Sequence, residues 1–245
     1  DQLIFTMEGG KDYIKDKKWD KSVDLRKVNH VNNGVDLEEY ENDVQNYQLY
    51  DEELENRSIF KVIYVGSVRC ANNIGTLVNV GEELKKRGKT NIKILIYGEG
   101  TDRASLEKDC KRKKLDNVIF KGKVEKKYVP YILSKSDLNI LNYKQAGTWK
   151  YGGSQNKQFE YLASGKPICS NVRMGYSIIR TNNCGIENNL TSIKDYADII
   201  VKYEEMNDSD YKQQCKNAKD VAQLYDYCIL ADKIEEVLRK CTQKK

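Results

Sequence analysis

Residues 151–170 read YGGSQNKQFEYLASGKPICS, and this segment is the most informative part of the chain. The glycines at 152–153 predict a tight turn with an exposed backbone, and Ser154 is a suitable N-cap for a following helix. Helix-tolerant residues continue over 155–163, and the Gly-Lys-Pro run at 165–167 is a stop signal. The segment therefore predicts a glycine turn that leads into a helix.

The start of this predicted helix is suited to an anion. Its first N–H groups lack partners within the helix and carry a partial positive charge. Lys157 in the first turn opposes the helix dipole, and an anionic ligand would explain it. Glu160, three residues further on, is an acceptor for hydroxyl groups such as those of a ribose. An ordinary surface helix after a glycine loop is the alternative.

Strands rich in Ile and Val alternate with helices from residue 59 onward. We expect strands at 60–66, 92–100, 117–122, 137–141 and 167–169, and a sixth that starts at 185. We expect helices at 73–87, 102–114 and 126–134, one from 176, and two or three over 192–241. This order predicts an α/β fold with a doubly wound, parallel, Rossmann-like sheet. Ligands bind beyond the carboxyl ends of such strands, where Gly66, Gly98, Gly100 and Gly122 fall.

The first 57 residues follow a different pattern. Short strands are expected at 3–6 and 27–31, with a brief lysine-rich helix between them. The segment 36–54 is acidic and rich in tyrosine, and we interpret it as a connector with a helical turn or two.

Composition narrows the chemistry. The chain has 245 residues and no run near the ~18 apolar residues that a membrane span needs. Seven cysteines without a Cys-x-x-Cys pair argue against a disulfide framework or a structural zinc site and favour a reducing compartment. His30 is the only histidine, which limits histidine-dependent catalysis and metal binding. We expect neither a metal nor another cofactor.

The net charge of +5 is concentrated between Ser105 and Pro130, where nine Lys or Arg face four Asp or Glu. A basic patch there would suit an anionic lipid, a polyphosphate or nucleic acid, and a solvated surface is the alternative. No aromatic and basic repeat of the kind that stacks bases accompanies it, so we expect no nucleic-acid partner.

A dinucleotide fingerprint and a P-loop are both missing. The chain reads GSVRCANNIG after the first long strand and GEGTDR after the second, where Gly-x-Gly-x-x-Gly is required. Gly-Lys-Thr occurs once, at 88–90, but Glu83 stands where a P-loop has its first glycine. The segment 151–160 is therefore the best candidate for binding a phosphate.

Together these segments resemble the C-terminal, donor-binding domain of the retaining glycosyltransferases with the GT-B fold. The family is the group 1 glycosyltransferases, which make bacterial surface polysaccharides such as capsule and O-antigen. The motifs that carry the resemblance occur in the family's order: VNNGVDLEEY (31–40), YVGS (64–67), IYGEG (96–100), NVIFKGKV (117–124), SDLNIL (136–141), NKQFEYLASGKPI (156–168) and NNCGI (182–186).

The resemblance implies a role for each matching residue. Glu160 would hold the ribose of a nucleotide-sugar, most simply a UDP-sugar that serves as substrate, while Arg69 and Lys157 would contact its diphosphate and stabilise the leaving group. These three residues are the predicted catalytic residues. The donor-binding set is Gly66, Ser67, Gly98, Gly100, Lys123, Val124, Gly153, Ser154, Gln155, Asn156, Lys157 and Glu160.

The sequence departs from the family at two positions. Gly152 stands where the first glutamate of the family's Glu-x7-Glu motif contacts the transferred sugar. Backbone N–H groups of 153–155 would substitute, in a form similar to members that transfer N-acetylated or deoxy amino sugars. Asn73-Ile74 replaces a lysine-glycine pair near Arg69, which weakens the diphosphate assignment there.

The resemblance also implies a domain plan. Residues 1–34 would be a remnant of the N-terminal acceptor domain and the start of the linker, 35–57 a connector, and 58–245 the donor-binding domain. We expect the chain to be part of a longer protein and inactive alone, with a glycan or polyprenyl-linked acceptor bound through the missing domain. A cytoplasmic location with peripheral contact at the inner face of the plasma membrane is expected.

Two other functions stay open. A sugar-nucleotide epimerase can share this two-domain fold, but it needs acid and base carboxylates near the sugar, and Gly152 removes one. A non-catalytic module would bind an anionic ligand through residues 105–130.

Overall fold

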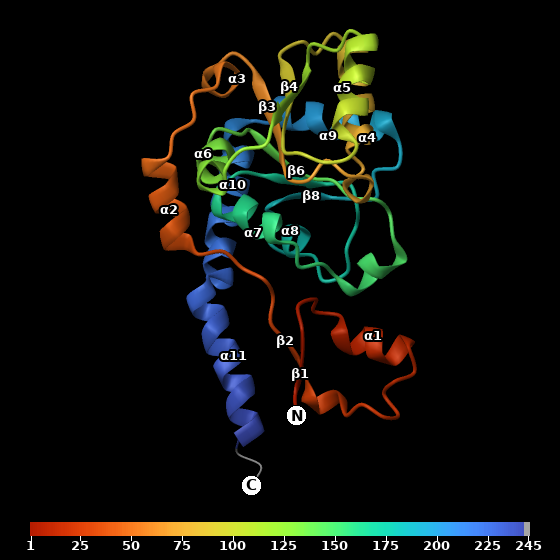
Figure 1. Cartoon of the computed structure of the whole chain (residues 1–245), viewed down its shortest axis with the longest axis vertical. Helices are drawn as coiled ribbons and strands as arrows, with labels where there is room; N and C mark the ends of the chain where they lie inside the picture. The colour runs from red at the N-terminus through yellow and green to blue at the C-terminus, as the bar shows by residue number, and fades with distance from the viewer. Residues whose placement is uncertain (243–245) are drawn as a thin grey trace.

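The computed structural model describes residues 1–242, and a six-stranded parallel sheet is at its centre (Figure 1). Across the sheet the strands are β5 (Val118–Gly122), β4 (Ile92–Tyr97), β3 (Phe60–Val65), β6 (Leu138–Leu141), β7 (Ile168–Ser170) and β8 (Gly185–Glu187). This order is that of a Rossmann-like doubly wound sheet, so the predicted fold class is confirmed.

The central strands are buried on both faces, which explains their apolar sequences. β3 reads FKVIYV and β4 reads IKILIY, and the four residues of β6 are all buried. Parallel strands covered by helices on both sides lose the alternation of polar and apolar residues that a half-exposed strand shows. The runs of Ile and Val therefore belong to the middle of a three-layer structure.

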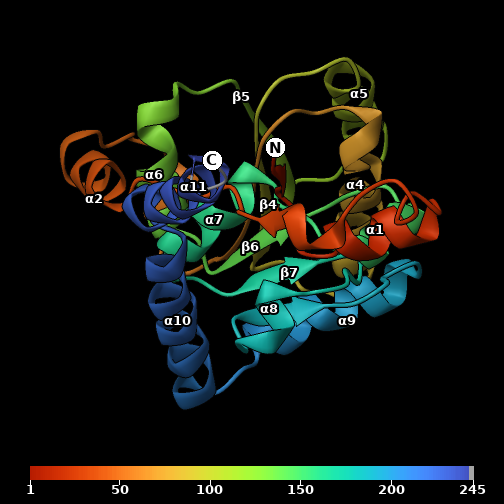
Figure 2. The ribbon, with the colours of Figure 1, turned by 90° about the horizontal axis from the view of Figure 1, so that it is seen from below.

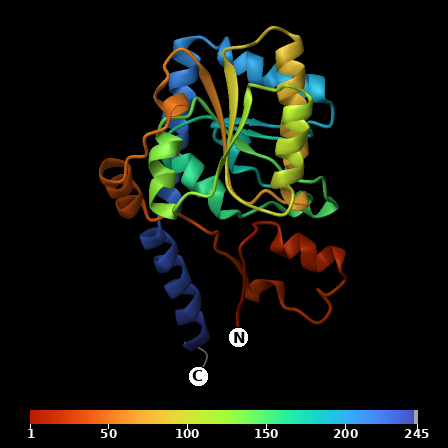
Figure 3. The same ribbon diagram turned by 45° about the horizontal axis from the view of Figure 1, so that its top comes forward.

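Helices cover both faces of the sheet, as Figure 3 shows. One apolar core lies under α4 (Ile74–Lys86), α5 (Arg103–Arg112) and α9 (Ile193–Glu204). The other lies under α6 (Val129–Ser134), α7 (Asn156–Ala163), α8 (Ile178–Thr181) and α10 (Asp208–Ala222). Short 3-10 turns are η2 (Cys70–Asn72), η3 (Lys126–Tyr128) and η5 (Gln223–Tyr225).

Residues 1–30 form a separate N-terminal unit near the carboxyl ends of the strands (Figure 1). It contains β1 (Leu3–Phe5), α1 (Gly10–Asp16), the turn η1 (Leu25–Lys27) and β2 (Val28–His30), and its two strands pair in parallel. The last helix, α11 (Tyr227–Thr242), projects beyond the sheet on the same side. The assignment of residues 1–34 as a remnant of an acceptor domain and the start of the linker remains a prediction, as do the other domain boundaries.

The connector is more helical than the sequence predicts. It contains α2 (Leu37–Asn46) and α3 (Glu52–Glu55), which begin with hydrogen-bonded caps from Asp36 and Asp51. Tyr40 and Leu54 are buried in the core beside α6 and α7. Caps and buried contacts with later segments stabilise these helices, which the polar composition of the segment does not predict.

Within residues 1–242, no helix combines the length and the apolar character that crossing a membrane requires.

Candidate functional site

The carboxyl ends of β3 and β6 form the centre of the candidate site. The chain leaves β3 toward α4 on one face of the sheet and leaves β6 toward α7 on the other. Doubly wound sheets bind ligands at such a switch point, because the diverging connections leave a crevice. Figure 2 views this edge of the sheet from below, with the N-terminal unit in front.

Lys157 lies in the first turn of α7 and contacts the end of β3. Its Nζ donates a hydrogen bond to the Tyr64 hydroxyl at 3.1 Å and lies 4.6 Å and 5.3 Å from the ring centres of Tyr64 and Tyr143. A Cβ atom at Gly66 would come within 3.1 Å of the same nitrogen. Burial lowers the pKa of Lys157 to about 8, although the charge of Glu160 opposes this shift. A bound anion would stabilise this partly buried cation.

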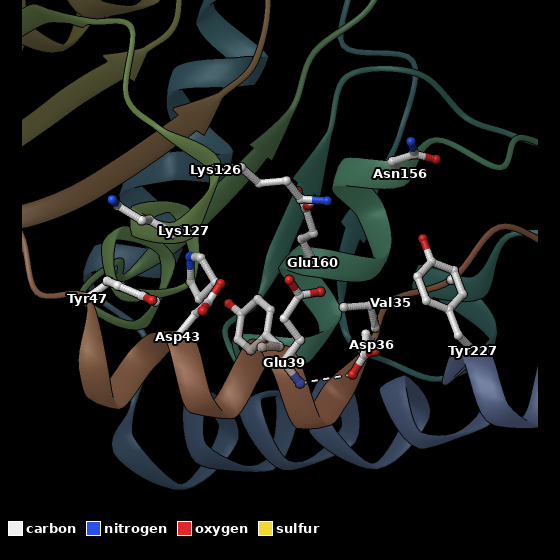
Figure 4. Close-up of a pocket in the computed structure, with 13 residues that line it drawn as sticks. Val35, Asp36, Glu39, Asp43, Tyr47, Lys126, Lys127, Asn156, Glu160 and Tyr227 are labelled. Atoms are coloured by element: carbon white, nitrogen blue, oxygen red, sulfur yellow. Dashed lines mark hydrogen bonds and ion pairs between the residues drawn. The ribbon is translucent and has the colours of Figure 1, made fainter.

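Glu160 follows one turn later in α7 and lines a pocket of about 500 Å³. The walls come from α2, from the segment 126–130, from the start of α7 and from Tyr227 (Figure 4). One carboxylate oxygen of Glu160 lies 3.8 Å from Nζ of Lys126, whose side chain is 86% exposed. Burial raises the pKa of Glu160, and the charges of Lys126 and Lys157 oppose that shift. The carboxylate can accept hydrogen bonds from ligand hydroxyls.

The structure confirms the glycine turn and corrects the role of Ser154. Gly152 has a φ of +92°, a conformation that favours glycine. The N-cap of α7 is Gln155, and within residues 1–242 this position makes no side-chain capping hydrogen bond. The hydroxyl of Ser154 instead accepts a hydrogen bond from the backbone N–H of Asn33 at 2.8 Å. Sequence reasoning missed this because the partner is 121 residues away.

The turn also lines a second pocket, of about 330 Å³, without charged side chains. Gly153, Ser154 and Gln155 face Trp149 and residues 5–7 of the N-terminal unit across it. The buried Oε1 of Gln155 has no hydrogen-bond partner within residues 1–242. The turn η4 (Gly147–Tyr151) leads into this loop and is held by a hydrogen bond from Gly9 N–H to the Tyr151 carbonyl oxygen at 3.0 Å.

Packing explains two of the glycines that the resemblance assigned to the donor. A Cβ atom at Gly98 would lie 1.8 Å from the Gly66 carbonyl oxygen, and one at Gly100 would lie 2.1 Å from that of Val68. These glycines let the loops after β3 and β4 approach each other. Ser67 belongs to the same loop, and its carbonyl oxygen accepts a hydrogen bond from Tyr64 at 2.9 Å.

The other predicted site residues occupy different environments. Arg69 and Lys123 are exposed in the loops after β3 and β5, and Asn156 is exposed on the rim of the Glu160 pocket. Val124 packs against the apolar core. The structure thus brings Gly66 together with Lys157, and Asn156 with Glu160. Contacts of Arg69, Lys123 and Val124 with a donor stay predictions.

The basic segment 105–130 is partly neutralised by neighbouring acids. Five of its nine cations lie within ion-pair distance of a carboxylate: Arg112, Lys113, Lys121, Lys126 and Lys127. This pairing favours the solvated-surface interpretation over a patch for an anionic polymer. In the described part of the chain, no group of three or more His, Cys, Asp or Glu side chains is placed to hold a metal ion. Independence from metals stays a prediction.

Sequence reasoning missed three tyrosines at the site. Tyr64 and Tyr143 enclose Lys157, and Tyr40 lines the Glu160 pocket from α2. Tyr64 and Tyr143 lie at the carboxyl ends of β3 and β6, where ligands bind in such sheets, and this position was the signal that could have identified them. No local pattern separates Tyr40 from the other tyrosines of the acidic connector.

The sheet order defines a Rossmann-like α/β domain, and a partly buried lysine, Lys157, lies at its switch point. Residues 59–205 match the family described as Glycosyl transferases group 1, and the chain belongs to this family. The family resemblance of the sequence is thereby confirmed. A search of the curated proteins found no match.

Solved glycosyltransferase structures share the fold. A glycosyltransferase from Rickettsia africae superposes with a TM-score of 0.76 at 14% identity, over 100% of this chain and 64% of its own. HepE from Anabaena in complex with UDP-glucose superposes with a TM-score of 0.72 at 14% identity, over 98% of this chain and 64% of its own. A variant of TarM from S. aureus was solved in complex with fondaparinux, α-GlcNAc-glycerol and UDP. It superposes with a TM-score of 0.69 at 20% identity, over 96% of this chain and 43% of its own. The chain thus spans less than two thirds of each of these relatives.

Proposed function

We propose that this chain is the donor-binding half of a retaining glycosyltransferase that uses a UDP-sugar. The enzyme transfers a hexose or an N-acetylated amino sugar to a glycan or lipid-linked acceptor in the synthesis of a surface polysaccharide. Family membership supports transfer, and the UDP and UDP-glucose complexes of the structural relatives support the donor. The observation that carries the proposal is the partly buried Lys157 at the switch point, one turn before Glu160.

In this proposal the diphosphate binds between Gly66 and the start of α7. The uncapped N–H groups of α7 and the Lys157 ammonium group would offset its charge. The same groups would stabilise the negative charge that develops on the departing UDP when the bond to the sugar breaks. Arg69, on the loop after β3, would add a second cation from the solvent side.

The ribose would lie against Glu160, and the sugar would extend toward the uncharged pocket at 153–155. A carboxylate can accept hydrogen bonds from the two adjacent hydroxyls of a ribose, and these hydroxyls are uncharged. The uncharged lining of the second pocket suits a neutral sugar, and Gln155 offers an amide to it. We further propose a cytoplasmic location with peripheral contact at the inner face of the plasma membrane.

Glu160→Ala is expected to weaken UDP binding by roughly 10- to 100-fold, because it removes charge-assisted hydrogen bonds to the ribose. The fold should persist, since the side chain of Glu160 is 22% exposed. Isothermal titration calorimetry with UDP measures the affinity, and the melting temperature reports on the fold. Glu125→Ala, which removes a 70% exposed carboxylate, is the matched control. Unchanged UDP affinity in the Glu160 variant would reject this assignment.

The chain alone is expected to bind UDP-sugars but to transfer no sugar, because an acceptor site is absent from the proposed half-enzyme. UDP release from UDP-glucose and UDP-N-acetylglucosamine, with and without glycan acceptors, measures this. Acceptor-dependent release above the level of a Lys157→Met control would contradict the half-enzyme proposal.

A further inference from the structure

The hydroxyl of Tyr40 is a buried polar group without a partner. Tyr40 is 6% exposed, and its hydroxyl oxygen has no hydrogen-bond partner within residues 1–242. The ring packs in the apolar core that contains Phe159 and Tyr161. Phenylalanine would supply the same packing without burying a hydroxyl, and burial of an unpaired hydroxyl is unfavourable. Packing therefore explains the ring of Tyr40 but not its oxygen.

An acceptor that lines the same pocket as Tyr40 is the Glu160 carboxylate, which comes from α7 and not from α2. Both residues line the 500 Å³ pocket between α2 and α7, and α2 packs directly against α7. Burial raises the pKa of Tyr40, and the negative charge of Glu160 raises it further. A phenol O–H is a donor, and an ionised carboxylate is an acceptor.

Lys126, the ion-pair partner of Glu160, is poorly suited to fix the orientation of the carboxylate. Lys126 lies 3.8 Å away and is 86% exposed, so its ammonium group is free to turn toward solvent. A long, exposed lysine contributes little to the geometry of a carboxylate. A rigid donor from the core side would do so, because rotation of a buried tyrosine is restricted by its packing.

We propose that Tyr40 is a positioning residue for Glu160. When a nucleotide enters the pocket, the Tyr40 hydroxyl donates a hydrogen bond to one oxygen of the Glu160 carboxylate, which turns the other oxygen toward the ribose hydroxyls. This inference rests on the proposed binding of a ribose at Glu160 and adds the residue that orients it. No covalent step is involved, and the hydroxyl keeps its proton.

The test compares UDP with 2′,3′-dideoxy-UDP by calorimetry in the native chain and in Tyr40→Phe. Loss of one neutral hydrogen bond should weaken UDP binding by roughly three- to tenfold. Binding of the dideoxy nucleotide should stay within about twofold, because it has no hydroxyls for Glu160 to hold. Tyr50→Phe is the matched control, since Tyr50 lies outside this pocket and is 88% exposed, and it should bind both nucleotides as the native chain does.

A second comparison uses the Glu160→Ala background, in which no acceptor remains at position 160 and Tyr40→Phe should no longer change the UDP affinity. The melting temperature of Tyr40→Phe should not fall, because the ring stays in place. Equal weakening of both nucleotides, or no weakening of UDP, would overturn the positioning role. If the native chain already binds the two nucleotides equally, the ribose site itself is wrong. If it discriminates between them and Tyr40→Phe behaves identically, only the role of Tyr40 fails.

Discussion

Lys157→Met is expected to weaken UDP binding by roughly 30- to 5000-fold while it makes the unliganded chain more stable at pH 7. The loss of affinity follows because truncating one partner of a desolvated charge pair costs about 2–5 kcal/mol. The gain in stability follows because the folded chain keeps a charged lysine beside Tyr64 and Tyr143, which lowers its pKa from 10.5 to about 8. That shift corresponds to a cost of about 3 kcal/mol for the charged form.

The pH dependence has a definite sign. Between pH 8 and 10.5 the unfolded chain binds a proton at Lys157 that the folded chain has released, so this group makes folding more favourable as pH rises. Below pH 8 both states are protonated and the full cost remains. The stability advantage of Lys157→Met should therefore be largest below pH 8 and should shrink above it.

Denaturant unfolding of the native chain and of Lys157→Met at pH 7 and pH 9.5 measures these differences, and calorimetry measures UDP affinity. Lys108→Met, at an exposed position of α5, is the control for removing a surface charge. A Lys157→Met variant that binds UDP as tightly as the native chain would contradict the diphosphate assignment. A variant of lower stability at pH 7 would contradict the cost of burying the charge.

Gly98→Ala is expected to destabilise the chain by roughly 3–5 kcal/mol, from a strained backbone and an overpacked contact. Gly98 has a φ of +148°, and a Cβ atom there would lie 1.8 Å from the Gly66 carbonyl oxygen. The clash involves backbone on both sides, so rotation of a side chain cannot relieve it. Because Gly66 contacts Lys157, the displaced loop should also weaken UDP binding.

Gly147→Ala is the matched control, because a Cβ atom there has no neighbour within 4 Å. Its free energy of unfolding should stay within about 0.5 kcal/mol of the native value. Urea unfolding followed by circular dichroism compares the two variants. A Gly98 variant as stable as the Gly147 variant would show that the loops after β3 and β4 adjust more easily than the structure implies.

The sequence predicts the sheet well because its signals are local. Ile- and Val-rich runs that end in glycine place β3 and β4 within one to three residues of the observed ends. The connector was predicted less well, because α2 depends on Tyr40 being buried against later segments. Ser154 was wrong as a cap for a similar reason, since its partner Asn33 lies far away in sequence.

The candidate site divides in the same way. Lys157 and Glu160 were proposed as site residues because their pattern is visible within one helix. A cation in the first turn and a carboxylate one turn later follow a glycine turn. The environment that gives Lys157 its lowered pKa was not predicted, because Tyr64 and Tyr143 come from two different strand ends. Gly98 was assigned to the donor, although contact with Gly66 already explains why it is glycine.

A structure from crystals of the chain grown with UDP tests most directly the claim that the diphosphate binds at Lys157 and the ribose at Glu160. We expect a phosphate oxygen within hydrogen-bond distance of Lys157 Nζ, next to Gly66, and the ribose hydroxyls on the Glu160 carboxylate. UDP bound at another surface, or a switch point closed by packed side chains at saturating UDP, would contradict it.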